Sequence, residues 1–246
     1  MPNLDHPALP VMDDLSRLYQ AQGHQLALTG GATRDFLLGK RPRDFDLVSD
    51  ATPEQTEQIL TKWAGNATRS LNRFGVVTAT FDKLKVQVLT FHTPRDWYPA
   101  FDPALLHEDP LMNQLLCADV TINTGTVVFP GCRWIDPLGA AEDVTDRLLR
   151  PPIDPYVTIA GNPHTMVRYA RFAAELGFRV TPQVRAAMTE LAGAIEKDLD
   201  WGVIVSLTKI LMAPDPGAGI TVLRDTGVLD HLPAAWRERL DGWESS

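Results

Sequence analysis

Residues 28–48 read LTGGATRDFLLGKRPRDFDLV, and this stretch decides the fold. The apolar run HQLALTGG predicts a short strand that enters a glycine turn at Gly30 and Gly31. ATRDFLLG then predicts a short helix that ends at Gly39, and DFDLV predicts a second strand. Residues 28–48 therefore contain, in order, a strand, a glycine turn, a helix, a basic loop and a second strand.

Asp44 and Asp46 stand two positions apart on the second predicted strand, so their side chains should share one face. Two carboxylates on one face repel each other unless a cation lies between them, and hard oxygen ligands suit Mg²⁺. Such a pair can hold metal ions that activate an attacking hydroxyl and neutralise a leaving pyrophosphate. The turn at Gly30 and Gly31 lets backbone N–H groups approach phosphates closely. Each feature alone is common, whereas the ordered combination is specific.

Composition indicates a soluble globular protein. The chain has 246 residues, of which 44% are hydrophobic, and this is enough for one large domain or two smaller ones. Its net charge of -8 argues against non-specific coating of nucleic acid but allows a local basic cleft. Two cysteines without a CxxC pair favour a reduced, cytoplasmic setting, and no apolar run reaches membrane-spanning length. Candidate residues of the cleft are Arg41, Arg43, Arg69, Arg73, Arg168 and Arg171.

The sequence pattern changes near residue 150. Before it, helical stripes alternate with strand patterns, including hairpins expected over residues 76–91 and 126–136 and a helix capped by Thr52. Residues 150–165 hold four prolines, as a linker would, and the apolar stripes beyond them predict only helices. We therefore expect an α+β domain over residues 1–150 and an all-helical domain over residues 151–246.

GGATRDFLLGKRPRDFDLV resembles the first signature of the class II CCA-adding enzymes and bacterial poly(A) polymerases. These enzymes belong to the DNA polymerase β-like nucleotidyltransferase superfamily. The resemblance implies a mixed-sheet nucleotidyltransferase head followed by a helical neck. It extends, in the same order, through residues 74–97, DVTINTG at 119–125, WIDPLGAAEDVTDRLLR at 134–150, VRYARFAAELGF at 167–178 and residues 208–233.

The resemblance also implies roles for residues of the expected head. Asp44 and Asp46 would bind the catalytic Mg²⁺ or Mn²⁺ ions, and Asp119 is a candidate third catalytic carboxylate. Gly30, Gly31 and Arg34 would shape the pocket for the triphosphate of ATP or CTP.

Further implied roles fall in the hinge and the neck. Asp136 and Asp143 would lie in the hinge between the two domains. Asn162, Thr165 and Arg168 would bind the nucleotide, although spacing alone suits a surface position for Arg168 equally well.

Three departures from the family pattern fall in the catalytic motifs. Gln87 replaces a glutamate that faces the metals; its amide can coordinate metal but carries no charge. Because Val86 and Val88 should face the core, Gln87 should point toward Asp44 and Asp46. Cys117 and Ala118 replace two arginines that precede Asp119. The base-reading motif EDxxR reads GNPHT at 161–165, so Asn162 replaces its aspartate and Thr165 its arginine.

Three functions agree with these observations. The first is nucleotidyl transfer to the 3′ hydroxyl of a tRNA-like RNA, the second is transfer to a small or non-tRNA acceptor, and the third is nucleotide binding without catalysis. The intact carboxylate pair favours the first two, and the altered motifs favour the last two; we prefer the first. The family's body and tail are absent from the sequence, so tRNA recognition is expected to be weak or supplied by another chain.

Overall fold

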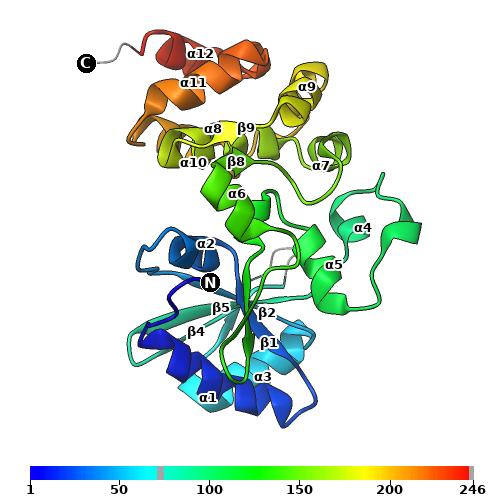
Figure 1. The fold of residues 1–246 in the computed structure, drawn as a ribbon, viewed down its shortest axis with the longest axis vertical. Helices are drawn as coiled ribbons and strands as arrows, with labels where there is room; N and C mark the ends of the chain where they lie inside the picture. Colours follow the sequence, from blue (N-terminus) through cyan, green and yellow to red (C-terminus); the bar gives the residue numbers. More distant parts are fainter. Residues whose placement is uncertain (71–74, 244–246) are drawn as a thin grey trace. The chain divides into compact units, whose positions relative to one another are not determined.

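The computed structural model describes residues 1–70 and 75–243, which form two compact units (Figure 1). The first unit comprises residues 1–93 and 107–144, and the second comprises residues 94–106 and 145–246. The segment 94–106 thus belongs to the second unit, and the domain boundary expected near residue 150 stays a prediction. Arg73, one of the arginines expected in a basic cleft, lies outside the described residues.

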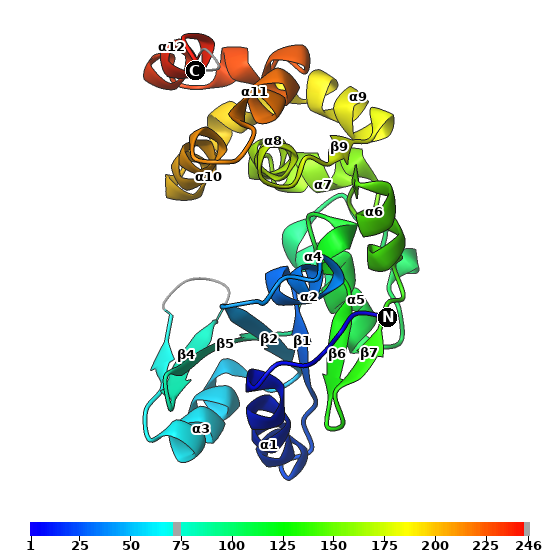
Figure 2. The ribbon, with the colours of Figure 1, turned by 60° about the vertical axis from the view of Figure 1, so that its left-hand side comes forward.

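Within the described residues, seven strands of the first unit form one mixed sheet in the order β3-β4-β5-β2-β1-β6-β7 (Figure 2). Strands β2 and β5 run parallel, and the other neighbouring pairs run antiparallel. Both predicted hairpins, β4–β5 and β6–β7, are confirmed. The strands are β1 (Leu26–Thr29), β2 (Phe45–Ser49), β3 (Thr68–Arg69), β4 (Val77–Phe81), β5 (Leu84–Thr90), β6 (Thr126–Phe129) and β7 (Arg133–Ile135).

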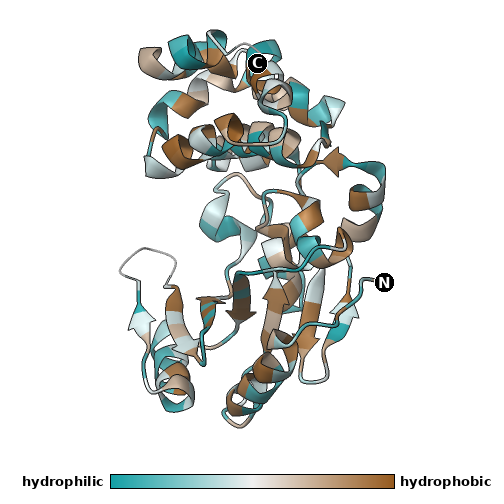
Figure 3. Cartoon of the chain, turned by 90° about the vertical axis from the view of Figure 1, so that its left-hand side faces the viewer, coloured by the Kyte–Doolittle hydropathy of each residue, from teal (hydrophilic) through white to brown (hydrophobic). Residues whose placement is uncertain are grey.

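Helices α1 (Ala8–Gln20) and α3 (Pro53–Ala64) pack on one face of this sheet. Alternate strand residues point into that layer, as side-chain alternation requires, and Leu28, Leu47 and Val86 are fully buried there. The central strands are accordingly coloured mostly as hydrophobic in Figure 3. The predicted cap of α3 is confirmed by a reciprocal pair of hydrogen bonds between Thr52 and Gln55.

The opposite face of the sheet is only partly covered. Helix α5 (Pro110–Leu116) packs Leu111 and Leu115 against Ala27 and Val48. Helix α2 (Gly31–Leu37) connects β1 to β2, and α6 (Ala140–Asp146) follows β7. Among the described residues of the first unit, one end of this face therefore carries no covering helix.

The second unit is helical apart from one short pairing. Strands β8 (Leu148–Leu149) and β9 (Arg179–Val180) form a two-residue parallel ladder, which the sequence pattern did not predict. Across the described residues, no helix is long and apolar enough to cross a membrane. The helices are α4 (Pro94–Trp97), α7 (Pro155–Gly161), α8 (His164–Leu176), α9 (Pro182–Glu190), α10 (Trp201–Leu211), α11 (Pro216–Asp225) and α12 (Ala234–Asp241).

Candidate active site

A row of polar side chains crosses four strands on the partly covered face of the sheet. The strand register pairs Asp46 on β2 with Thr29 on β1 and with Gln87 on β5. It also pairs Gln87 with Thr78 on β4, and the Gln87 amide nitrogen donates to the Thr78 hydroxyl at 3.5 Å. Residues paired across neighbouring strands point to the same face. Thr29, Asp46, Gln87 and Thr78 therefore form one polar row, in which Gln87 is the neighbour of Asp46.

The row stays polar because it lies beyond the area that α5 covers. On the same face, two residues from Thr29, Asp46 and Gln87 along their own strands, lie Ala27, Val48 and Leu89. These three residues pack in the apolar cluster under α5. Each strand thus contributes an apolar residue beneath the helix and a polar residue outside it. The fold leaves the polar row accessible to a ligand.

Asp44 and Asp46 form an acidic pair at the start of β2. Asp44 immediately precedes the strand, which begins at Phe45, one residue later than the sequence pattern predicted, and both side chains are exposed. The pKa of the Asp46 carboxyl is raised, chiefly because surrounding protein atoms partly desolvate it and also because the Asp44 charge repels its ionised form. The ammonium group of Lys85 acts in the opposite direction.

The raised pKa of Asp46 has a consequence for stability. A carboxyl whose pKa is higher in the folded than in the unfolded state destabilises the fold at neutral pH. This cost disappears as the pH falls through the folded-state pKa, because the group then takes up a proton. A divalent cation between the two carboxylates would relieve the same repulsion without a proton.

Gly30 brings a tight turn directly beside Asp46. Its backbone has φ +81° and ψ -142°, a conformation that other residues rarely adopt. A Cβ atom at Gly30 would lie 3.8 Å from Oδ2 of Asp46. The next residue, Gly31, begins α2 with ordinary helical geometry. The predicted glycine turn and the predicted metal ligand Asp46 therefore lie side by side.

Asn123 anchors this turn from a distant part of the chain. Its carbonyl oxygen accepts hydrogen bonds from the Gly30 N–H at 3.0 Å and from the Thr29 hydroxyl at 3.1 Å. Its Oδ1 accepts from Nη1 of Arg34 at 3.4 Å, and Nη2 of Arg34 donates to Asp35 at 2.8 Å. The sequence analysis assigned no role to Asn123. The only indication in the sequence was that Asn123 lies in DVTINTG, one of the segments that resemble the family.

The two acidic residues expected in a hinge have structural partners in the first unit. Asp136 accepts hydrogen bonds from the backbone N–H groups of Ala140 and Ala141 at 2.7 and 2.9 Å, and so caps α6. Asp143 is buried and accepts a hydrogen bond from the Thr121 hydroxyl. Both carboxylates therefore hold local structure together.

The catalytic role expected of Asp119 stays a prediction. Among residues 1–70 and 75–243, no three or more His, Cys, Asp or Glu side chains are grouped so that they could hold a metal ion. Asp119 is half-buried and follows α5, outside the row formed by Asp46 and Gln87. Two pairs of candidate ligands are neighbours: the Asp44 charge acts on Asp46, and Gln87 is the partner of Asp46 in the strand register.

The altered motif at 161–165 lies between α7 and α8 of the second unit. Thr165 is fully buried and its hydroxyl donates to the Asn162 carbonyl, so its side chain offers no surface to a nucleotide. This burial is at odds with the nucleotide-binding role expected of Thr165. A Cβ atom at Gly161 would lie 2.8 Å from Cδ1 of Tyr98 and 2.9 Å from the Trp97 carbonyl oxygen. The packed 94–106 segment leaves no room there for the family's glutamate.

His164 and Arg168 lie along the first turns of α8. The His164 ring forms a hydrogen bond of 2.9 Å with the Ser206 hydroxyl, which links α8 to α10. Burial lowers the pKa of His164, and the positive charge of Arg168 lowers it further, so the imidazole is neutral near pH 7. The Arg168 guanidinium lies 5.7 Å from the ring centre of Phe172. Asn162 and Arg168 are both half-buried, and their nucleotide contacts stay a prediction.

Comparisons with known proteins agree with this architecture. Residues 26–150 match the family model described as the poly A polymerase head domain. Residues 177–238 match a second model, described as the probable RNA and SrmB-binding site of polymerase A. The CC-adding tRNA nucleotidyltransferase of Shouchella clausii is 29% identical over 217 residues, which are 88% of this chain and 52% of that protein. Poly(A) polymerase I of Escherichia coli O157:H7 is 28% identical over 201 residues, 77% of this chain and 42% of that protein.

Solved structures show the same fold. The Bacillus stearothermophilus CCA-adding enzyme in complex with CTP superposes with a TM-score of 0.77 at 23% identity, over 93% of this chain and 55% of that one. The Thermotoga maritima CCA-adding enzyme complexed with tRNA superposes with a TM-score of 0.76 at 18% identity, over 97% of this chain and 57% of that one. The expected α+β head followed by a helical neck is thereby confirmed. The chain spans about half the length of the curated relatives it matches.

Proposed function

Because the chain belongs to the poly A polymerase head domain family, we propose that it transfers a nucleoside monophosphate from a nucleoside triphosphate to the 3′ hydroxyl of an RNA. One observation of the site carries this proposal: the exposed pair Asp44 and Asp46 lies beside the Gly30 turn, with Gln87 in register with Asp46. ATP and CTP are the proposed nucleotides, and a tRNA-like 3′ end is the proposed acceptor.

The side chains at this site suit a hard divalent cation, Mg²⁺ or Mn²⁺. Asp44 and Asp46 supply two carboxylates, and Gln87 supplies a neutral amide oxygen. Partial burial chiefly raises the pKa of Asp46, and the charge of Asp44 raises it further. When bound, such an ion would polarise the reacting phosphate and favour ionisation of the attacking hydroxyl. The fit is weaker than with three acidic ligands, because only two of the three carry charge.

The other residues of the site position the reactants. Because Gly30 has no side chain, the polypeptide chain is exposed beside Asp46, where a triphosphate can approach without meeting a side chain. Asn123 holds this turn in place through the Gly30 N–H. Arg34 is 17% exposed and already bound to Asp35, so its role is to brace α2 and offer a partly neutralised guanidinium toward phosphate.

A transfer experiment with different acceptors separates this proposal from its two alternatives. The purified chain would be incubated with labelled ATP or CTP and Mg²⁺ in the presence of RNA, of small hydroxyl compounds, or of no acceptor. Lengthened RNA supports the proposal. Labelled product without RNA supports transfer to a small acceptor, and nucleotide binding without product supports a non-catalytic homologue, which the buried Thr165 and crowded Gly161 favour.

Weak discrimination among the four nucleoside triphosphates is expected. In the family pattern a charged pair reads the base edge, whereas here Thr165 is buried and Asn162 carries no charge. A site rejects the wrong base strongly only when mismatching leaves buried polar groups unpaired. Competitive titration with ATP, CTP, GTP and UTP should therefore give dissociation constants within about a hundredfold of one another, or roughly 2.7 kcal/mol. A wider spread would show that other residues read the base.

The substitution Gln87→Glu should tighten Mg²⁺ binding by about tenfold, or roughly 1.4 kcal/mol, because a third carboxylate joins the row beside Asp46. Calorimetric titration with Mg²⁺, wild type beside variant, measures the change. Gln58→Glu is the matched control, since it adds the same charge on the exposed side of α3. Equal metal affinity in wild type and Gln87→Glu would contradict the placement of Gln87 at the metal.

A further inference from the structure

A second concave site lies in the first unit, apart from the polar row. The N-terminal residues 3–7 run along the C-terminal end of α2 and the loop after it, and enclose a pocket of about 320 Å³. That volume is in the range of sites that hold small ligands. Polar and charged side chains from both segments line it: Asn3, Asp5, His6, Lys40 and Arg41, with Phe36 as the apolar wall.

The loop at this pocket is fixed to the core at its centre. Pro42 is buried, and His6 forms a hydrogen bond with its carbonyl. The His6 ring packs between two aromatic rings, 6.1 Å from Phe36 and 5.2 Å from Phe45 between ring centres. Because Pro42 and His6 hold the loop in place, Lys40 and Arg41 present their charges from a defined position.

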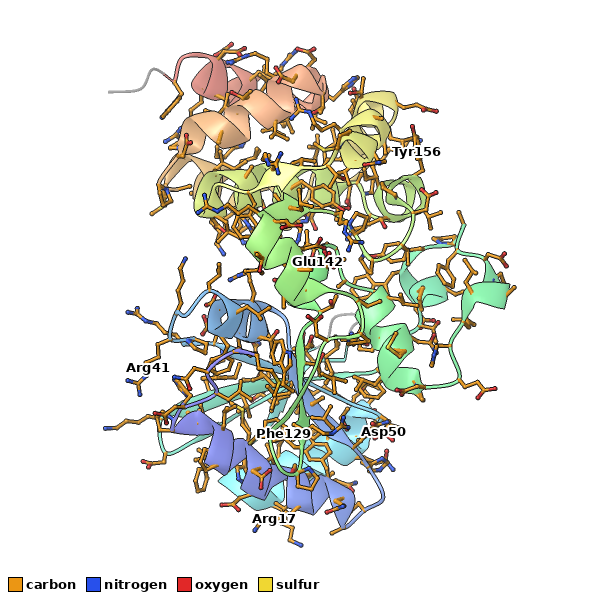
Figure 4. The ribbon with its side chains drawn as sticks, in the orientation of Figure 1. Arg17, Arg41, Asp50, Phe129, Glu142 and Tyr156 are labelled. Atoms are coloured by element: carbon orange, nitrogen blue, oxygen red, sulfur yellow. The ribbon has the colours of Figure 1, made fainter. Side chains whose placement is uncertain are left out.

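The charge at the pocket has the opposite sign to that of the whole chain. The chain carries a net charge of -8, yet residues 40–43 read KRPR, and Lys40, Arg41 and Arg43 are exposed. Of the lining residues only Asp5 is acidic, and within the described part of the chain neither Lys40 nor Arg41 has a carboxylate partner within 4 Å. Figure 4 shows the Arg41 side chain extending from the loop toward solvent. These cations are therefore available to an anionic ligand.

The position of the loop relates this pocket to the acidic pair. Arg43 is followed directly by Asp44, and Lys40 is four residues before Asp44, so the extended chain between them spans at most about 14 Å. The pocket lies at the C-terminal end of α2, whereas Gly30 and Asp46 lie at its N-terminal end, about 10 Å away along a helix of seven residues. An extended ligand with several phosphates can reach both places, whereas a compact one occupies a single place.

We propose that the pocket formed by residues 3–7 and Lys40–Arg41 binds a backbone phosphate of the RNA strand whose 3′ hydroxyl is the acceptor. The inference rests on the proposed function, because it assigns this phosphate to the same RNA. Guanidinium and ammonium groups are the side chains that bind phosphate best, the former through paired hydrogen bonds. The Asn3 amide and the His6 ring line the same pocket and supply further hydrogen-bonding groups.

Fluorescence anisotropy with a short labelled single-stranded RNA, without nucleotide, tests this directly. The double variant Lys40→Ala/Arg41→Ala should bind RNA roughly tenfold more weakly. The slope of its logarithmic binding constant against the logarithm of salt concentration should fall by the amount expected for the loss of about one to two phosphate contacts. Lys40→Arg/Arg41→Lys keeps both charges and should bind within about threefold of wild type. Lys62→Ala/Lys83→Ala removes two exposed charges elsewhere in the same unit and should leave RNA binding unchanged. Thermal unfolding of each variant confirms that the fold is kept.

Parallel titrations with ATP and with inorganic tripolyphosphate separate the possible sources of the phosphate. We expect the double variant Lys40→Ala/Arg41→Ala to bind ATP and tripolyphosphate with the same affinity as the wild type. Loss of tripolyphosphate binding with RNA binding retained would assign the pocket to the nucleotide and overturn the proposal, as would unchanged RNA binding in the double variant. If the wild-type chain binds RNA through this pocket but transfers no nucleotide, the proposed function fails, and with it the assignment of this RNA as the acceptor, whereas the phosphate site for RNA stands.

Discussion

Replacing Asp46 with asparagine is expected to reduce Mg²⁺-dependent nucleotidyl transfer by at least about a thousandfold, or roughly 4 kcal/mol of transition-state stabilisation. Asp46 lies at the centre of the polar row, beside the Gly30 turn and in register with Gln87. Asparagine keeps its shape but removes one of the two carboxylates proposed to bind the metal. Steady-state incorporation of labelled ATP into RNA measures the loss.

The matched control for this substitution is Asp82→Asn. Asp82 is an exposed carboxylate in the turn between β4 and β5, at φ +42°, a backbone conformation that asparagine tolerates well. It removes the same charge from the same unit and should leave transfer within about twofold of wild type. Asp46→Asn should also raise stability at neutral pH, because it removes a charge that burial chiefly disfavours and that Asp44 also repels, the two causes that raise the pKa of Asp46. Full activity in Asp46→Asn would exclude the polar row as the reaction site.

Gly30→Ala is expected to cost about 1–3 kcal/mol in the free energy of unfolding and to lower transfer activity sharply. The positive φ of +81° combined with ψ -142° is accessible almost only to glycine. Alanine must either adopt this strained conformation or move the turn, and moving it breaks the hydrogen bond from the Gly30 N–H to Asn123. Denaturant unfolding and the transfer assay measure the two effects.

The adjacent glycine provides the control, because Gly31 begins α2 without a positive φ. A Cβ atom there would lie 3.6 Å from Nη2 of Arg34, which is ordinary van der Waals contact. Gly31→Ala should therefore leave the free energy of unfolding unchanged or raise it by up to about 1 kcal/mol through helix propensity. Equal destabilisation by both substitutions would show that the conformation of Gly30 is not what the fold requires.

Local sequence patterns predicted the elements of the site because interactions between residues close in the sequence determine those elements. The two hairpins, the Thr52 cap and the fold class were all predicted from residue patterns and are confirmed. The i, i+2 spacing of Asp44 and Asp46 placed both at the start of one strand, although Asp44 precedes the hydrogen-bonded part. Alternation along β5 likewise predicted that Gln87 points away from the core residues Val86 and Val88, as the register with Asp46 bears out.

What sequence reasoning missed depends on contacts between distant residues. The carbonyl of Asn123 reaches Gly30 only because β6 pairs with β1, and no local pattern encodes that pairing. The pocket at Lys40 and Arg41 exists because residues 3–7 fold back along α2. The burial of Thr165 and the crowding at Gly161 arise from packing within the second unit, whereas the resemblance implied a nucleotide-binding role for Thr165.

The most direct test of the account is Mg²⁺-dependent nucleotide incorporation by the wild-type chain. Purified protein would be incubated with a 5′-labelled RNA, Mg²⁺ and each of ATP, CTP, GTP and UTP in turn, and with the same mixtures containing excess chelator. We expect that the RNA is lengthened at its 3′ end with ATP or CTP, that chelator abolishes the product, and that Asp46→Asn lengthens the RNA at least about a thousandfold more slowly. RNA that stays at its original length with all four nucleotides, or lengthening by Asp46→Asn at the wild-type rate, would contradict this expectation.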